Sequence, residues 1–138
     1  MRKRSQSREF ALQVLYQIDI TRDDPGRALE DFWGTCEGNE TEEAVKVFTR
    51  DLVGGVVGNL AAIDLKISQY AKNWELERMA VVDRNILRLG VYELIYRNDI
   101  PPKVSINEAV ELAKKYSDVQ AGKFVNGILD KIKSERPK

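Results

Sequence analysis

Residues 80–97 read AVVDRNILRLGVYELIYR, and this stretch decides the fold. Its apolar residues lie on nearly every side of a helix: Val81, Val82, Ile86, Leu87, Leu89, Val91, Leu94 and Ile95. A helix that is apolar almost all round is usually buried among other elements. The segment therefore predicts a central helix of an all-α fold.

Helical periodicity continues on both sides of this segment. Residues 5–22 carry one stripe from Phe10 to Ile18, a short helix with Leu29, Phe32 and Trp33 follows Pro25-Gly26, and residues 34–39 read as a loop. The last helix carries the stripe Phe124, Val125, Ile128, Leu129 and Ile132. Sustained strand alternation does not occur, so we expect about six or seven helices.

Residues 42–72 predict one long helix with Thr41 as its N-cap. Gly54, Gly55 and Gly58 interrupt it, and each weakens a helix relative to alanine. Close approach by another helix would compensate for them, and a break near residue 58 is the alternative. We expect the same close packing at Asn126-Gly127.

The segment from Asn98 to Pro102 ends the central helix, because proline cannot continue a helix. The following Ser105-Ile106-Asn107-Glu108 fits the capping-box pattern. It predicts that the next helix begins there and runs to Tyr116.

Length and composition bound the function. The 138 residues fit one domain, and no apolar run is long enough to span a bilayer, so we expect a cytoplasmic protein without a membrane segment. The chain has no histidine and a single cysteine, Cys36, which argues against a metal site and an activated nucleophile. No glycine fingerprint of a cofactor site follows a strand, so we expect no cofactor.

Charge is distributed unevenly although 22 basic residues balance 22 acidic ones. Residues 1–8 hold Arg2, Lys3, Arg4 and Arg8 and no acid, whereas residues 19–43 are acidic. Cations at a helix start can bind phosphates. A solvated basic tail is the alternative.

Several ordered blocks resemble the family of the bacterial transcription antitermination factor NusB. They are VDRNILRL at 82–89, DIP at 99–101, INEAVELAK at 106–114 and KFVNGILD at 123–130, with Arg8-Glu9, Ala11-Leu12-Gln13 and Leu15-Tyr16 near the start. The resemblance spans nearly the whole chain and is weak only between about residues 20 and 50.

This resemblance implies a single RNA-binding domain over residues 1–138, folded as two small crossed helical subdomains. It also implies binding of single-stranded boxA RNA together with the ribosomal protein NusE, within a complex that keeps RNA polymerase processive on ribosomal RNA operons. The resemblance is also compatible with a homodimer in the absence of ligand.

Family comparison places RNA contacts at Tyr70, Tyr116, Gln120, Lys123 and Phe124. The charge of Arg2, Lys3, Arg4 and Arg8 at a helix start, taken with the resemblance, adds these four residues as expected RNA contacts. Single-stranded RNA is read by aromatic stacking beside cations, which fits the group around Phe124 and Lys123. We expect Tyr116 to end one helix, Gln120 to lie in the turn and Phe124 to open the next helix. Core packing is the alternative for Phe124 and Tyr70, and a solvated face is the alternative for Lys114 and Lys115.

The family positions that face the ribosomal protein fall on Tyr16 and Asp83. Tyr16 lies off the stripe of its helix, and tyrosine is a common interface anchor. Asp83 and Arg84 interrupt an apolar helix, so we expect them at its exposed edge. The alternative for Asp83 is an ion pair with a nearby arginine.

Two other function classes compete with the RNA-binding hypothesis. An enzyme is disfavoured, because Gly54-Gly55-Val56-Val57-Gly58 lies within a helical stripe and is a poor phosphate loop. A module that binds protein but not RNA remains open, and the salt dependence of RNA binding distinguishes the two.

Overall fold

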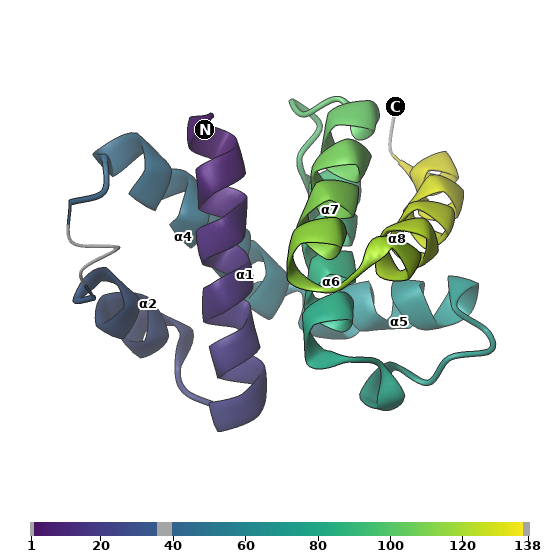
Figure 1. Cartoon of the computed structure of the whole chain (residues 1–138), viewed down its shortest axis with the longest axis horizontal. Helices are drawn as coiled ribbons and strands as arrows, with labels where there is room; N and C mark the ends of the chain where they lie inside the picture. The colour runs from purple at the N-terminus through teal and green to yellow at the C-terminus, as the bar shows by residue number, and fades with distance from the viewer. Residues whose placement is uncertain (1, 36–39, 137–138) are drawn as a thin grey trace. The chain divides into compact units, whose positions relative to one another are not determined.

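The computed structural model describes residues 2–35 and 40–136, and Figure 1 shows it as an assembly of helices. Within these residues there are seven α-helices and no strand, which confirms the all-α prediction. The helices are α1 (Lys3–Thr21), α2 (Pro25–Trp33), α4 (Glu43–Gly58), α5 (Leu60–Tyr70), α6 (Val81–Tyr96), α7 (Pro102–Tyr116) and α8 (Val119–Ile132). Two short 3-10 helices, η1 (Leu76–Arg78) and η2 (Lys133–Glu135), complete the described part. Most of the predicted 34–39 loop lies outside it.

The chain divides into two compact units, Met1–Gly58 and Asn59–Lys138. The N-terminal unit holds α1, α2 and α4, which pack against one another. The C-terminal unit holds α5 to α8 with η1 and η2. That residues 1–138 act as one domain stays a prediction.

Helix α6 is the buried centre of the C-terminal unit, as its sequence predicts. It contacts α5, α7 and α8, and every residue from 85 to 94 is buried. Two charged residues on it bind neighbouring helices. Arg88 donates from Nε and Nη2 to the two carboxylate oxygens of Asp64 at 2.8 and 3.0 Å, and Glu93 accepts from the Ser105 hydroxyl at 2.8 Å. Pairing of this kind is what buried charges require.

The single long helix predicted for residues 42–72 is wrong, and the alternative break is confirmed. α4 ends at Gly58 and α5 begins at Leu60, with Asn59 between them at φ −121° and ψ 22°. Thr41 is not the N-cap, because the Glu42 carbonyl accepts the first helical bond, from the Lys46 N–H at 3.2 Å. Gly54, Gly55 and Gly58 are weak helix formers, and they lie in the last turns of α4, where the predicted long helix is broken.

The capping box predicted at Ser105 is also wrong. α7 begins three residues earlier, at Pro102, and the Pro101 carbonyl accepts from the Ser105 N–H at 3.2 Å. Proline is favoured at the first position of a helix, where its missing N–H has no partner to lose. The two prolines therefore start α7, and the buried Ser105 hydroxyl serves Glu93 instead.

Close helix packing occurs at a glycine other than those predicted. A Cβ at Gly54, Gly58 or Gly127 would meet no described atom within 4 Å apart from the backbone of its own helix and its chain neighbours, so close approach by another helix does not explain these glycines. A Cβ at Gly90 would lie 2.5 Å from Leu129 Cδ1. Leu129 is fully buried, so α8 approaches α6 at a point where only glycine fits.

Gly90→Ala is therefore expected to destabilise the protein by roughly 1–3 kcal/mol, as overpacking of a dense core does. Gly127→Ala, in the same unit, should instead stabilise it by about 0.5–1 kcal/mol, because its site is open and no described glycine has a positive φ. Urea unfolding of both variants measures the difference. Equal midpoints for the two would contradict the packing described here.

Candidate nucleic-acid interface

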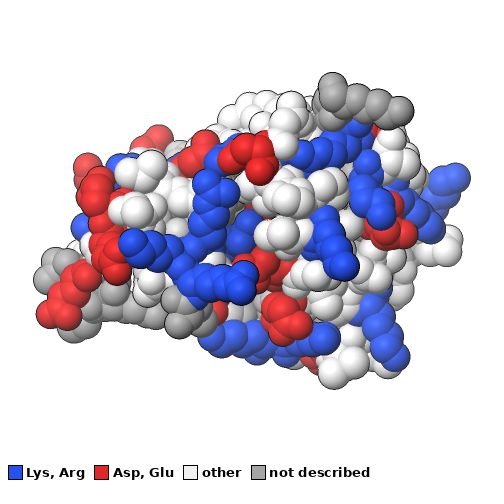
Figure 2. Space-filling view, turned by 90° about the horizontal axis from the view of Figure 1, so that it is seen from above, with Lys and Arg blue, Asp and Glu red and all other residues white. Residues whose placement is uncertain are grey.

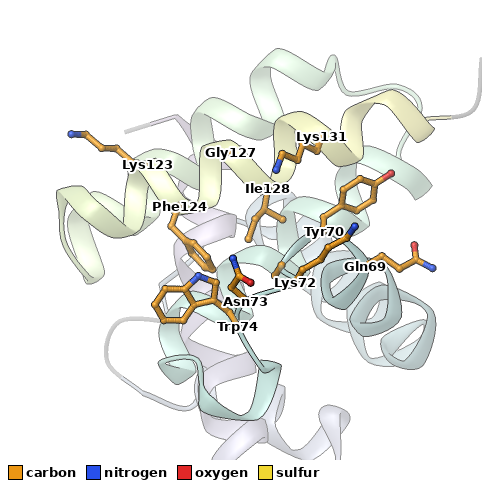
Figure 3. Close-up of a pocket in the computed structure, with 11 residues that line it drawn as sticks. Gln69, Tyr70, Lys72, Asn73, Trp74, Lys123, Phe124, Gly127, Ile128 and Lys131 are labelled. Carbon is orange, nitrogen blue, oxygen red and sulfur yellow. The ribbon is translucent and has the colours of Figure 1, made fainter.

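A hollow of about 800 Å³ lies between the end of α5 and α8 in the C-terminal unit (Figure 3). The segment that leaves α5 forms one wall, with Gln69, Tyr70, Ala71, Lys72, Asn73 and Trp74. The other wall is α8, with Lys123, Phe124, Gly127, Ile128 and Lys131. The predicted site residues Tyr70, Lys123 and Phe124 are therefore brought to one surface from distant parts of the sequence.

Two aromatic rings meet at one end of this hollow. The Trp74 and Phe124 centroids are 5.6 Å apart with an interplanar angle of 69°, an edge-to-face arrangement. Trp74 is 59% exposed and Phe124 is half-buried, so both rings keep surface that a planar ligand can cover. The alternative of pure core packing does not describe Phe124, and Tyr70 is likewise only half-buried.

Trp74 was missed in the sequence analysis, which followed apolar stripes. It follows α5, in the polar run Lys72-Asn73-Trp74-Glu75, where no periodicity marks it. A tryptophan surrounded by polar residues is expected to be exposed. Because large exposed aromatic side chains often mark binding sites, this pattern could have identified Trp74 from the sequence.

The hollow is locally basic although the chain is neutral. Its lining includes Lys72, Lys123 and Lys131, all exposed, and no acidic residue. Figure 3 shows Lys123 extending outward from α8, while Lys72 and Lys131 lie toward the Tyr70 end. Over the face presented in Figure 2, basic and acidic side chains are interspersed, as a balance of 22 against 22 suggests. The excess of basic side chains is therefore a local property of this hollow.

Three predictions about the chain near Phe124 have different outcomes. Tyr116 ends α7, as predicted, and is 36% exposed. Gln120 is not in the turn, because α8 begins at Val119. Phe124 is the sixth residue of α8 rather than its opening residue, since Asp118 caps the helix by accepting from the Ala121 N–H at 2.7 Å.

A second hollow of about 370 Å³ shares the Trp74 and Phe124 rings with the first. Asp83 and Gln120 line it. Asp83 is half-buried rather than at an exposed edge, and its Oδ1 is buried without a hydrogen-bond partner among the described residues. The alternative ion pair is not formed in the described part of the chain, where Arg84 donates to the Glu77 carbonyl at 3.3 Å.

The N-terminal cations lie in the other unit and differ in exposure. Arg2, Lys3 and Arg4 are exposed, with Lys3 Nζ 2.9 Å from Glu42 and the Arg4 guanidinium 4.5 Å from the centre of the Phe48 ring. Arg8 is only 3% exposed and also lies over Phe48. A side chain so buried is poorly placed for a phosphate. Tyr16, by contrast, is 41% exposed, as predicted.

Tyr70 is held by the C-terminal end of the described chain. Its hydroxyl donates to Glu135 Oε2, and Lys66 Nζ pairs with Oε1 of the same carboxylate. The hydrogen bond to Glu135 raises the pKa of Tyr70, and the bonds from Lys66 and Tyr70 lower the pKa of Glu135. The contact therefore stabilises the fold above the usual carboxylate pKa and is lost as pH falls through the lowered value.

The described residues contain no group of three or more His, Cys, Asp or Glu side chains arranged to hold a metal ion. None of their helices combines the length and the hydropathy needed to cross a membrane.

The model of the NusB family matches residues 5–134. The transcription antitermination protein NusB of Myxococcus xanthus is 46% identical over 133 residues, which cover 96% of this chain and 95% of the relative. The Bacillus velezensis protein of the same name is 47% identical, over 96% of this chain and 97% of the relative. Among solved structures, T. maritima NusB superposes with a TM-score of 0.89 at 40% identity, covering 98% of this chain and 93% of that one. A chain from a crystal structure of antitermination factors NusB and NusE in complex with dsRNA superposes with a TM-score of 0.87 at 36% identity, covering 98% of each.

Proposed function

The chain belongs to the NusB family of transcription antitermination proteins, and on this premise we propose that it binds single-stranded boxA-type RNA together with NusE. In this role it would join the antitermination complex of RNA polymerase and promote processive transcription of ribosomal RNA operons. Such work on nascent RNA belongs in the cytoplasm. The proposal assigns the protein binding roles and no catalytic step.

The observation that carries the proposal is the exposed Trp74–Phe124 pair beside three lysines. Every base has a flat face, and stacking on an aromatic side chain contributes about 1–3 kcal/mol per base. Lysine ammonium groups attract the phosphates between such bases. A hollow with both features, lined by Tyr70 at its other end, suits a short single strand better than a duplex, whose bases are already stacked.

The exposed cations at the start of α1 support a second contact with the RNA backbone. Arg2 and Arg4 offer guanidinium groups, which bind phosphate in a bidentate geometry, and Lys3 could exchange its partner Glu42 for a phosphate. Arg8 is left out of the proposal because its side chain is buried. Tyr116 and Gln120 remain proposed contacts, since both are exposed close to the Lys123 end of α8.

Contact with NusE is proposed through Tyr16 and Asp83. The relative solved with NusE and dsRNA supports NusE as the partner, because it matches this chain over 98% of its length. The unpartnered Oδ1 of Asp83 is an acceptor that a donor from a partner would satisfy, and leaving it unsatisfied is costly. We also propose that, without ligand, two copies of the chain form a homodimer in which each copy covers binding surface of the other.

A protein-only interaction module is the competing function. It shares the fold and the partner surface but lacks RNA affinity. Binding of labelled single-stranded boxA-type RNA, followed by fluorescence anisotropy with and without NusE at several salt concentrations, separates the two. A double-stranded RNA of the same length is the comparison ligand, because the related complex contains dsRNA.

Trp74→Ala should weaken binding of the single strand by about 1–3 kcal/mol, or roughly 5- to 150-fold, through the loss of one stacked base. Leu65→Ala is the matched control, since Leu65 is a 62% exposed apolar residue on α5 outside this hollow. Anisotropy titrations compare the two, with circular dichroism as the check on folding. Equal affinities for both variants would remove Trp74 from the site.

Replacement of Arg2, Lys3 and Arg4 by alanine should lower RNA affinity and leave the helical fold intact. Each lost phosphate contact reduces the slope of log affinity against log salt by about 0.7 for a single strand, so three contacts reduce it by about 2. Titrations at four salt concentrations measure the slope. An unchanged slope and affinity would mean that these three side chains make no contact with the RNA.

Asp83→Lys should impair NusE binding far more than binding of RNA alone, because it places a cation where a buried acceptor now lies. Retention of NusE by immobilised protein and RNA anisotropy are measured on the same preparation. NusE retained equally by the variant and the wild type would place the partner surface elsewhere.

A further inference from the structure

The described chain ends in a short segment that is fastened to the C-terminal unit at two points. Glu135 binds Lys66 and Tyr70 of α5, and Arg136 donates from Nη1 to the Ile100 carbonyl at 2.9 Å and from Nη2 to the Asn98 carbonyl at 2.6 Å. Arg136 anchors the backbone next to Glu135, while Lys66 and Tyr70 bind the Glu135 carboxylate directly. The position of this carboxylate is therefore fixed both by its backbone and by its partners. It lies next to the hollow because Tyr70 lines that hollow.

Lys66 and Tyr70 offer the donors that a phosphate group needs. They are four residues apart on α5 and so lie on the same face, one turn from each other. Their ammonium and phenol groups converge on the two oxygens of one carboxylate. Lysine and tyrosine side chains are also common donors to nucleic-acid phosphates. A carboxylate bound in this way stands where an oxyanion of phosphate would stand.

We propose that Lys66 and Tyr70 form a phosphate subsite at the edge of the hollow, which Glu135 occupies in the free protein and an RNA backbone phosphate takes over. This inference rests on the proposed RNA binding. It adds Lys66 and Tyr70 as a contact to one phosphate and Glu135 as the residue that competes with that phosphate. Glu135 thereby weakens RNA binding until enough of the strand is held elsewhere to displace it.

The exposure of the contact suits such an exchange. The Lys66 and Glu135 side chains are 28% and 33% exposed, and ion pairs open to solvent are weak and screened by salt. A strand already stacked on Trp74 and Phe124 presents its phosphates at high local concentration, which favours displacement of one carboxylate.

The test uses the full chain, labelled single-stranded boxA-type RNA and the variant Glu135→Gln. Glutamine keeps the shape and an acceptor for the Tyr70 hydroxyl but removes the charge that neutralises Lys66. RNA affinity should rise about three- to tenfold, and the salt slope should steepen by about 0.7, the value for one added phosphate contact on a single strand. Lys66→Met in the Glu135→Gln background should abolish both gains.

Asp130→Asn is the matched control, because it removes one acidic charge near the same end of α8 without touching Lys66 or Tyr70. A gain as large in Asp130→Asn as in Glu135→Gln would overturn the subsite, since it would reflect net charge alone. No gain in Glu135→Gln, or a gain that survives Lys66→Met, would overturn it as well.

The outcomes also separate this inference from the proposed function. Wild-type protein that binds no RNA would defeat both, whereas wild type that binds RNA without any gain in Glu135→Gln defeats only the subsite. Tyrosine ionisation followed by ultraviolet absorbance checks the contact itself. In Glu135→Ala the pKa of Tyr70 should fall toward its usual value of about 10, and an unchanged titration would contradict the placement of Glu135.

Discussion

The enclosure of α6 is the constraint on which the C-terminal unit depends. A helix apolar on nearly every side cannot remain stable in water, so α5, α7 and α8 must cover it. The approach of α8 is set at Gly90, where Leu129 fills the space that a side chain would need. The Arg88–Asp64 pair ties α5 to the same helix. These contacts bring the end of α5 and the middle of α8 to one surface, and the hollow between them results from that geometry.

The proposed function requires a neutral protein to bind an anion, and the side chains left at this surface provide the groups for it. The core takes the apolar residues of the stripes, while Trp74 and part of Phe124 stay outside it with three lysines nearby. Recognition then depends on local stacking and local charge rather than on a field from the whole molecule. In the proposed phosphate subsite, Glu135 limits the RNA affinity of the free protein, and the strand and the partner protein together complete the interaction.

The sequence predicted the elements whose burial follows a regular period, and it failed where the deciding neighbour is distant. The stripes of α1, α6 and α8 each place apolar residues at helical spacing, so these helices were found. The role of a glycine depends on the atoms opposite it, which is why Gly90 was overlooked and Gly127 misread. Trp74 belongs to no stripe, and the contact between Tyr70 and Glu135 joins residues 65 positions apart, a separation at which no sequence pattern operates.

The most direct measurement of the central claim is the emission of Trp74 during titration with single-stranded boxA-type RNA. The chain has two tryptophans, so a Trp33→Phe variant leaves Trp74 as the sole reporter. Stacking of a base on Trp74 predicts saturable quenching that tracks RNA anisotropy and weakens as salt rises. RNA that binds by anisotropy while the Trp74 emission stays unchanged would contradict the assignment of this hollow as the site of base stacking.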